Sequence, residues 1–162
     1  MSINTAFTET GGVHRIGGFG IRCVMGGRES GQRLSLVEHP LAPHALAAPL
    51  HRHSREDEFS YVLRGRVGAK LGDRVVYGEA GDLIVKPRGE WHTFWNAGDE
   101  EASLLEVISP AGFERYFEEL IAVLADGGPD PEKIGPIAAR YSLELDPSTI
   151  PDLCQEFGLT FG

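Results

Sequence analysis

Two segments about forty residues apart carry side chains that could hold one metal ion. His51 and His53 stand two positions apart, and His92 stands in the second segment. On an extended strand, residues i and i+2 point to the same side, about 6–7 Å apart along the chain, so two imidazoles can converge on one cation. An acidic side chain shortly after His53 would complete a set of three imidazoles and one carboxylate. Such a set suits manganese, iron, cobalt, nickel, copper or zinc rather than calcium or magnesium.

The choice of carboxylate depends on a change of strand phase between residues 54 and 57. Three acidic residues, Glu56, Asp57 and Glu58, follow His53. An odd separation, as between His53 and Glu58, cannot place both side chains on one side of a straight strand. The polar, turn-like residues 54–57 predict a bend or bulge that would reset the phase. Spacing alone leaves the three acidic residues as near-equal candidates.

Strand parity also predicts which apolar side chains accompany this group. Val62 shares the face of Glu58, and Phe94 shares the face of His92. An aromatic ring beside an inward-facing histidine suits the wall of a small-molecule pocket, so we expect Val62 and Phe94 to line a substrate pocket. The remaining polar candidates match no motif. We expect surface or loop positions for His14, His39 and His44, and a solvated turn for Glu56 and Asp57.

Both segments resemble the paired sequence motifs of the cupin superfamily. The first matches H-x-H-x4-E-x6-G with His51, His53, Glu58 and Gly65, and the second matches G-x5-P-x-G-x2-H-x3-N with Gly81, Pro87, Gly89, His92 and Asn96. One turn position departs, because Ala45 stands where the family often has glycine. The resemblance implies that Glu58 is the carboxylate ligand. It implies one divalent transition metal (Fe, Mn, Ni, Co, Cu or Zn) held by His51, His53, Glu58 and His92.

The composition is that of an ordinary globular protein with an excess of acidic residues. The chain has 162 residues, 41% hydrophobic and 24% charged, and a formal net charge of −9. This charge argues against nucleic acid and anionic membrane surfaces as partners, because binding them needs a basic surface. Cys23 and Cys154 are far apart, which predicts no disulfide framework and a cytoplasmic location. We expect no signal peptide in residues 1–5 and no membrane-spanning segment.

Short strands separated by turn residues are expected up to Pro110. Turns are indicated at Gly72-Asp73 and Gly98-Asp99, and extended segments are predicted at 13–25, 33–38, 45–53, 58–63, 66–71, 74–77, 83–86, 91–96 and 103–108. This spacing is typical of an antiparallel sandwich or barrel, and a closed arrangement would remove exposed edges. The cupin resemblance implies the same fold. We therefore predict a mainly β, antiparallel jelly-roll β-barrel over residues 1–110.

The pattern changes to helical spacing after Pro110. Phe113, Phe117, Leu120 and Leu124 recur at spacings of three and four residues, which predicts an amphipathic helix that ends at Gly127-Gly128. Residues 130–145 and 146–161 then repeat one pattern, in which Asp-Pro starts a short helix and an apolar extended tail follows. We predict that residues 111–162 form a C-terminal helical extension packed on the barrel or on the partner of a dimer.

The chain length, the single motif pair and the sequence at 112–117 resemble small, single-domain, quercetinase-like cupins. This resemblance implies a metal-dependent dioxygenase that uses oxygen on a flavonol-like or other small enol or aromatic substrate. We also expect a homodimer. Glu58 would have a second, catalytic role as the base that accepts a proton from a bound hydroxyl. Two alternatives stay open, because one ligand set serves several chemistries. They are a non-catalytic cupin that binds a small molecule, and a metal-dependent isomerase or decarboxylase.

Overall fold

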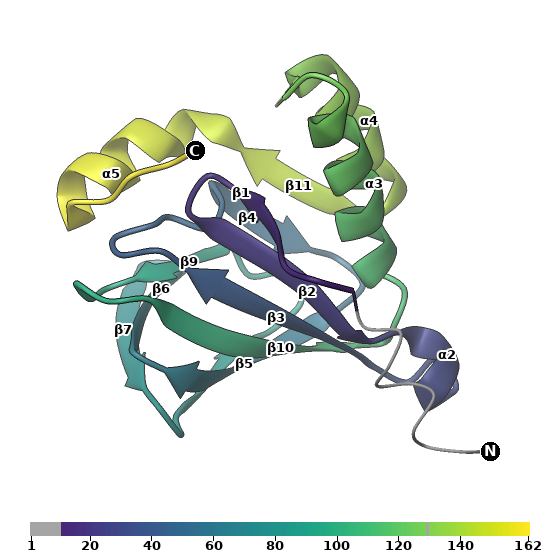
Figure 1. Cartoon of the computed structure of the whole chain (residues 1–162), viewed down its shortest axis with the longest axis horizontal. Coiled ribbons are helices and arrows are strands. Elements are labelled where there is room, and N and C mark those ends of the chain that lie inside the picture. The colour runs from purple at the N-terminus through teal and green to yellow at the C-terminus, as the bar shows by residue number, and fades with distance from the viewer. Residues whose placement is uncertain (1–10, 129) are drawn as a thin grey trace.

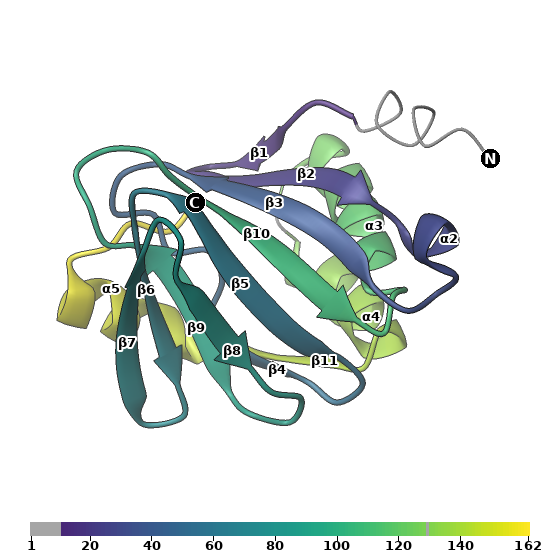
Figure 2. The same cartoon turned by 90° about the horizontal axis from the view of Figure 1, so that it is seen from below.

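Two antiparallel sheets face each other in the computed structural model, which describes residues 11–128 and 130–162 (Figures 1 and 2). The six-stranded sheet has the order β1 (His14–Ile16), β2 (Phe19–Met25), β3 (Ser35–Leu41), β10 (Ala102–Ser109), β5 (Asp57–Arg64) and β8 (Leu83–Lys86). The five-stranded sheet has the order β11 (Leu143–Asp146), β4 (Leu50–His53), β9 (His92–Asn96), β6 (Arg66–Leu71) and β7 (Arg74–Glu79). The prediction of a mainly β, antiparallel fold is confirmed, although the two sheets keep separate edges instead of closing into one ring.

Side chains from both sheets fill the space between them. On β5, Ser60 and Val62 are buried while Tyr61 and Leu63 are exposed, as the predicted strand phase requires. A large apolar cluster is shared by the two sheets and contains Leu41, Ala47, Val62, Val67, Ala69, Leu71, Ile84, Phe94, Ala102 and Leu104. The interior therefore holds the two sheets together by burial of apolar side chains.

The chain bends between the two strands that carry the first motif. β4 ends at His53, Ser54 and Arg55 form a bend, and β5 begins at Asp57. This bend resets the alternation of side chains, so His53 and Glu58 both face inward despite their odd separation. The predicted change of phase is confirmed.

The other motif residues build turns around the strands. Gly81 and Gly89 have φ values of 98° and 79°, a left-handed region that glycine enters without the steric penalty of a Cβ atom. The side-chain amide of Asn96 donates to three backbone carbonyls, those of Leu41, Ala42 and Glu100. These residues fix the loops next to β9 and so the position of that strand.

The C-terminal part alternates helices with extended segments that return to the sheet. α3 (Glu114–Ala125) is followed by α4 (Pro131–Arg140) and β11, and then by η1 (Pro147–Thr149) and α5 (Ile150–Phe157). Both repeats begin as predicted, because Asp130 accepts from the Glu132 N–H and Asp146 from the Ser148 N–H. Both repeats also end in extended chain: β11 pairs with β4, and Thr160 forms a parallel bridge with Ala45.

Two further apolar clusters join this C-terminal part to the sheets. One packs Phe113, Tyr116, Ile137 and Leu143 against side chains of the six-stranded sheet that include Ile21, Val37 and Ile108. The other packs Leu153 and Leu159 against Leu46 and Trp95. In Figure 1, α3 and α4 lie at one side of the sheets and α5 at the other.

One further helix and two expectations concern parts of the chain outside the main sheets. A short helix, α2 (Gly27–Ser30), follows β2. None of the helices within residues 11–128 and 130–162 is long and apolar enough to cross a membrane. The expectation of no signal peptide concerns residues 1–5, which lie outside the described residues.

Candidate metal centre

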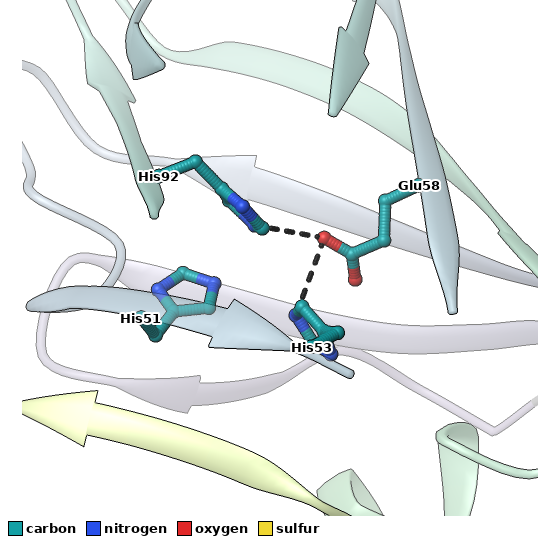
Figure 3. A group of neighbouring side chains, drawn as sticks. All are labelled: His51, His53, Glu58 and His92. Carbon is teal, nitrogen blue, oxygen red and sulfur yellow. Dashed lines mark hydrogen bonds and ion pairs between the residues drawn. The ribbon is translucent and has the colours of Figure 1, made fainter. Parts of the chain in front are cut away.

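Four buried side chains from three strands converge between the sheets (Figure 3). His51 and His53 lie on β4, Glu58 on β5 and His92 on β9, and one ligand atom from each lies within 4.8 Å of the others. None of the four is more than 7% exposed. His51 is the direct antiparallel partner of His92, which brings the two sequence motifs together. The structure thus assembles all four of the ligands expected from the sequence.

Hydrogen bonds to the backbone fix which nitrogen of His51 and of His92 faces this group. Nδ1 of His51 lies 2.8 Å from the Pro49 carbonyl oxygen, and Nδ1 of His92 lies 3.0 Å from the Glu90 carbonyl oxygen. A carbonyl only accepts, so each Nδ1 donates and each neutral ring keeps a lone pair on Nε2. Burial lowers the pKa of both histidines, that of His51 to well below its usual value. Both rings are therefore held in the neutral form that binds metals.

The contact between His92 and Glu58 brings two hydrogen-bond acceptors together. Nε2 of His92 lies 3.1 Å from Oε2 of Glu58, and Nε2 of His53 lies 3.4 Å from the same oxygen. With His92 neutral, a nitrogen lone pair faces a carboxylate oxygen. Nε2 of His53 is buried and has no hydrogen-bond partner among the described residues. A cation between these atoms would satisfy all of them, so the donor set fits a divalent transition metal.

A buried ion network lies behind Glu58. Nζ of Lys86 lies 3.3 Å from Oε2 of Glu58 and 2.7 Å from Oε2 of Glu106. The Ser60 hydroxyl donates to the same oxygen of Glu106 at 2.9 Å. Lys86 and Glu106 are 1% and 2% exposed, and charges so far from water are stable only when they are paired. The network therefore holds the Glu58 carboxylate beside the three imidazoles.

Burial and the charges in this network also shift the pKa values of its members. Burial alone would raise the pKa of Glu58, but electrostatic interactions with the side chains of His53 and Lys86 hold it well below its usual value. Burial alone would lower the pKa of Lys86, but Glu106 and Glu58 raise it. Burial raises the pKa of Glu106 to about 7 against the opposing effect of Lys86. At neutral pH Glu58 is thus an anion, as a metal ligand must be.

The C-terminal extension covers one of the candidate ligands. The Phe113 ring packs edge-on against the His53 ring, with the ring centres 4.4 Å apart. Phe113 in turn stacks on Tyr116 of α3. On β11, Leu143 is the antiparallel partner of His53. Residues far along the chain therefore hold the ring and the backbone of His53.

Val62 and Phe94 face inward, as strand parity predicts. Both belong to the large apolar cluster, in which Val62 is fully buried and Phe94 is 5% exposed. Nζ of Lys86 lies between this apolar cluster and the candidate ligands, 4.5 Å from the centre of the Phe94 ring and 3.3 Å from Oε2 of Glu58. The role of Val62 and Phe94 as walls of a substrate pocket stays a prediction.

The surface or loop position expected for His39 is wrong. His39 lies on β3 between the inward-facing Val37 and Leu41, and it is 1% exposed. Its ring stacks on Phe19, and its Nδ1 donates to the Gly20 carbonyl. Burial lowers its pKa to about 4. Its alternation with Val37 and Leu41 was the signal in the sequence that it faces inward.

The solvated turn expected for Glu56 and Asp57 is wrong for Glu56, which is 6% exposed. Its carboxylate points toward His53 because the bend at Ser54 and Arg55 turns the chain inward there. Asp57 does face outward, where it pairs with Arg88. By contrast, His14 is exposed on β1, and His44 lies in a loop where it contacts Asp99, as expected.

The sequence motifs did not predict that Lys86 and Glu106 are buried beside the candidate metal centre. Each alternates with apolar residues that face inward, Lys86 with Ile84 and Glu106 with Leu104 and Ile108. This alternation was a usable signal. It is a weak one, because a charged residue in a strand is seldom fully buried unless it is paired.

Comparison with known families identifies the domain that carries these residues. The family model for the Cupin domain matches residues 38–108, which include all four candidate ligands. No curated protein sequence matches the chain.

Solved structures with the same fold are numerous but distant in sequence. KdgF from Halomonas sp. is 18% identical with a TM-score of 0.56, over 65% of this chain and 91% of that chain. A protein described as a predicted oxalate decarboxylase from Thermotoga maritima is 22% identical with a TM-score of 0.58, over 64% of this chain and 96% of that one. An RmlC-like cupin from Shewanella frigidimarina is 22% identical with a TM-score of 0.54, over 64% and 86%. At these identities the similarity shows the jelly-roll fold alone.

Proposed function

Since this chain belongs to the cupin superfamily, we propose that it is a metal-dependent enzyme, an oxygen-dependent dioxygenase acting on a flavonol-like or other small enol or aromatic substrate. In our proposal His51, His53, Glu58 and His92 hold one divalent transition metal. Both atoms of O₂ would enter the product, so the reaction needs no external reductant.

One observation carries the metal-dependent part of this proposal. Nε2 of His92 and Oε2 of Glu58, two acceptors in the neutral-ring state, lie 3.1 Å apart in a buried site. A proton on Nε2 of His92 could also join the two atoms. Burial lowers the pKa of that ring and so disfavours the protonated form. A metal ion removes the conflict and also gives a partner to Nε2 of His53.

The residues around the metal would divide the work between binding and proton transfer. A bound transition metal supplies Lewis-acid polarisation of a substrate oxygen and, for a redox-active ion, electron exchange with oxygen. Glu58 accepts the hydroxyl proton of the enol, a step that needs its carboxylate within hydrogen-bond reach of that hydroxyl. Lys86 keeps Glu58 in place during this transfer, because it is paired with that carboxylate and with Glu106.

A second candidate is a metal-dependent decarboxylase or isomerase of a small organic acid. It is favoured by the position of Lys86, whose ammonium group lies 3.3 Å from Glu58 and 4.5 Å from the centre of the Phe94 ring, the expected pocket wall. A buried cation beside a metal site suits a small anion better than a large apolar ring. The packing of Val62 and Phe94 in the apolar cluster favours the same choice.

Oxygen uptake by the metal-loaded protein tests the proposal. The protein is reconstituted with each of the six metals, and oxygen consumption is measured with flavonols and with small keto and dicarboxylic acids. We expect uptake that depends on substrate and is lost in His92→Ala. Product formation without oxygen would instead support the decarboxylase or isomerase. Tight binding of a tested compound without turnover, both with and without oxygen, would instead support a non-catalytic cupin that binds a small molecule.

A further inference from the structure

Two buried polar atoms next to the candidate metal centre face each other without hydrogen bonds. They are Nδ1 of His53 and Oε2 of Glu56, and they lie 3.7 Å apart. This distance exceeds that of a hydrogen bond. The side chains are only 2% and 7% exposed, so water is not a ready partner for either. Unpaired polar atoms in such a place are costly, and this pair needs an explanation.

The chemistry of a metal-bound imidazole explains why these two atoms face each other. A neutral ring that binds a metal through Nε2 carries its hydrogen on Nδ1, and that N–H needs an acceptor. His51 has the Pro49 carbonyl, and His92 has the Glu90 carbonyl. For His53, the carboxylate of Glu56 is the acceptor candidate within the described part of the chain.

We propose that Glu56 is a positioning residue that accepts the hydrogen of His53 Nδ1, and so orients Nε2 of His53 toward the metal. This inference rests on the proposed metal site. A closer approach of about 0.5–1 Å brings the two atoms into hydrogen-bond distance. The acceptor also makes the ring a stronger ligand, since a carboxylate draws the hydrogen of Nδ1 and raises the basicity of Nε2.

The backbone on either side is held in a way that points Glu56 at His53. The Gly89 N–H donates to the His53 carbonyl at 2.7 Å, and Ser54 N–H donates to the Ser142 carbonyl. The next residue, Asp57, turns outward and accepts from the backbone N–H and the guanidinium of Arg88. Two successive carboxylates therefore point in opposite directions, and Asp57 offers a matched control with the same change of charge.

Titration with Co²⁺ in competition with a chelator tests the inference. We expect Glu56→Ala to weaken Co²⁺ binding about 10–100-fold, the usual cost of losing such an acceptor. Glu56→Gln should bind more tightly than Glu56→Ala, because its amide oxygen still accepts the hydrogen. Asp57→Ala should stay within about threefold of the wild type. Equal Co²⁺ affinity in the wild type and in Glu56→Ala would overturn the inference.

The tautomer of His53 gives a second readout that a merely structural role would not move. In ¹⁵N-detected spectra of the metal-free protein, we expect the hydrogen on Nδ1 in the wild type and in Glu56→Gln, and a shift toward Nε2 in Glu56→Ala. The same tautomer in all three would overturn the inference. A wild type that binds no Co²⁺ would instead overturn the proposed function, and the spectra would still decide whether Glu56 holds His53. Glu56→Gln serves both measurements if Glu56→Ala does not fold.

Discussion

The interior between the two sheets has an apolar part and a polar part, and the same strands build both. β5 contributes Val62 to the apolar part and Ser60 and Glu58 to the polar part. On its two neighbouring strands the interior changes from apolar to polar over two residues as well, from Ile84 to Lys86 on β8 and from Leu104 to Glu106 on β10. In the other sheet, β9 changes in the same way from Phe94 to His92.

The two parts contribute differently to the free energy of folding. Burial of apolar side chains stabilises the fold, at about 1.5–3 kcal/mol for a large side chain. Burial of charged groups costs free energy even when they are paired, and replacing such groups by apolar residues often leaves a protein as stable or more so. The polar part is therefore best explained by function. Substitutions in the two parts should have separable effects on stability and on metal binding.

Removal of the C-terminal extension should have the largest effect on stability and should disturb the polar part directly. Truncation after Gly112 removes Phe113, which packs on His53, and β11, which pairs with β4. It removes no residue of the large apolar cluster, whose last member in the sequence is Leu104. It also uncovers two other clusters. The decrease in the free energy of unfolding should be comparable to the whole stability of a domain, about 5–15 kcal/mol. Size-exclusion chromatography and calorimetry measure it, and an unchanged melting temperature would show that the extension is dispensable.

Lys86→Met should destabilise the polar part by about 3–5 kcal/mol, because it leaves the carboxylates of Glu58 and Glu106 buried without their cation. Urea denaturation of the metal-free protein measures this loss. The double variant Lys86→Met/Glu106→Leu should recover most of it, since it removes one of the unpaired charges. If the single and double variants were equally stable, the ion network would not explain the polar part.

Phe94→Ala should test the apolar part and should lower the free energy of unfolding by a similar amount. Loss of a buried phenylalanine costs about 3–5 kcal/mol through lost contacts and the cavity left behind. Metal content should stay at that of the wild type, because Phe94 belongs to the apolar cluster. Denaturant melts and elemental analysis of the same sample check both statements. A variant that keeps its stability but loses metal would place Phe94 in the polar part.

His39 predicts a smaller, pH-dependent effect. Its pKa of about 4 in the folded protein is below the value near 6.5 expected for an unfolded chain. Between these values the unfolded state binds the extra proton, so the free energy of unfolding should fall as the pH decreases from about 6.5 to 4. The contribution of His39 to this pH dependence is about 3 kcal/mol.

The His39→Asn variant isolates this contribution, because asparagine keeps a donor for the Gly20 carbonyl but does not titrate. Unfolding free energies of variant and wild type, measured at several pH values, should diverge below pH 6.5. Parallel curves would show that His39 is not the group responsible.

Local patterns in the sequence predicted much of the fold and the three histidine ligands, whereas the choice of Glu58 among three acidic residues came from the resemblance to the cupin motif. The spacing from His51 to Glu58 and the bend after His53 are properties of one short segment, and alternation placed Val62 and Phe94 inward. The partners of Lys86 and Glu56 were not predictable in this way. Lys86 is paired with Glu106, twenty residues away on another strand. Glu56 faces His53, whose ring is covered by Phe113 of the C-terminal extension, far along the chain.

The metal content of the purified protein tests the central claim most directly. The wild type, His51→Ala/His53→Ala and the control His14→Ala/His44→Ala are purified in parallel without added metal, and each is analysed for transition metals per chain. We predict one metal ion per chain in the wild type and the control, and almost none in His51→Ala/His53→Ala, with all three folded by circular dichroism. Equal metal content in all three proteins would contradict the account.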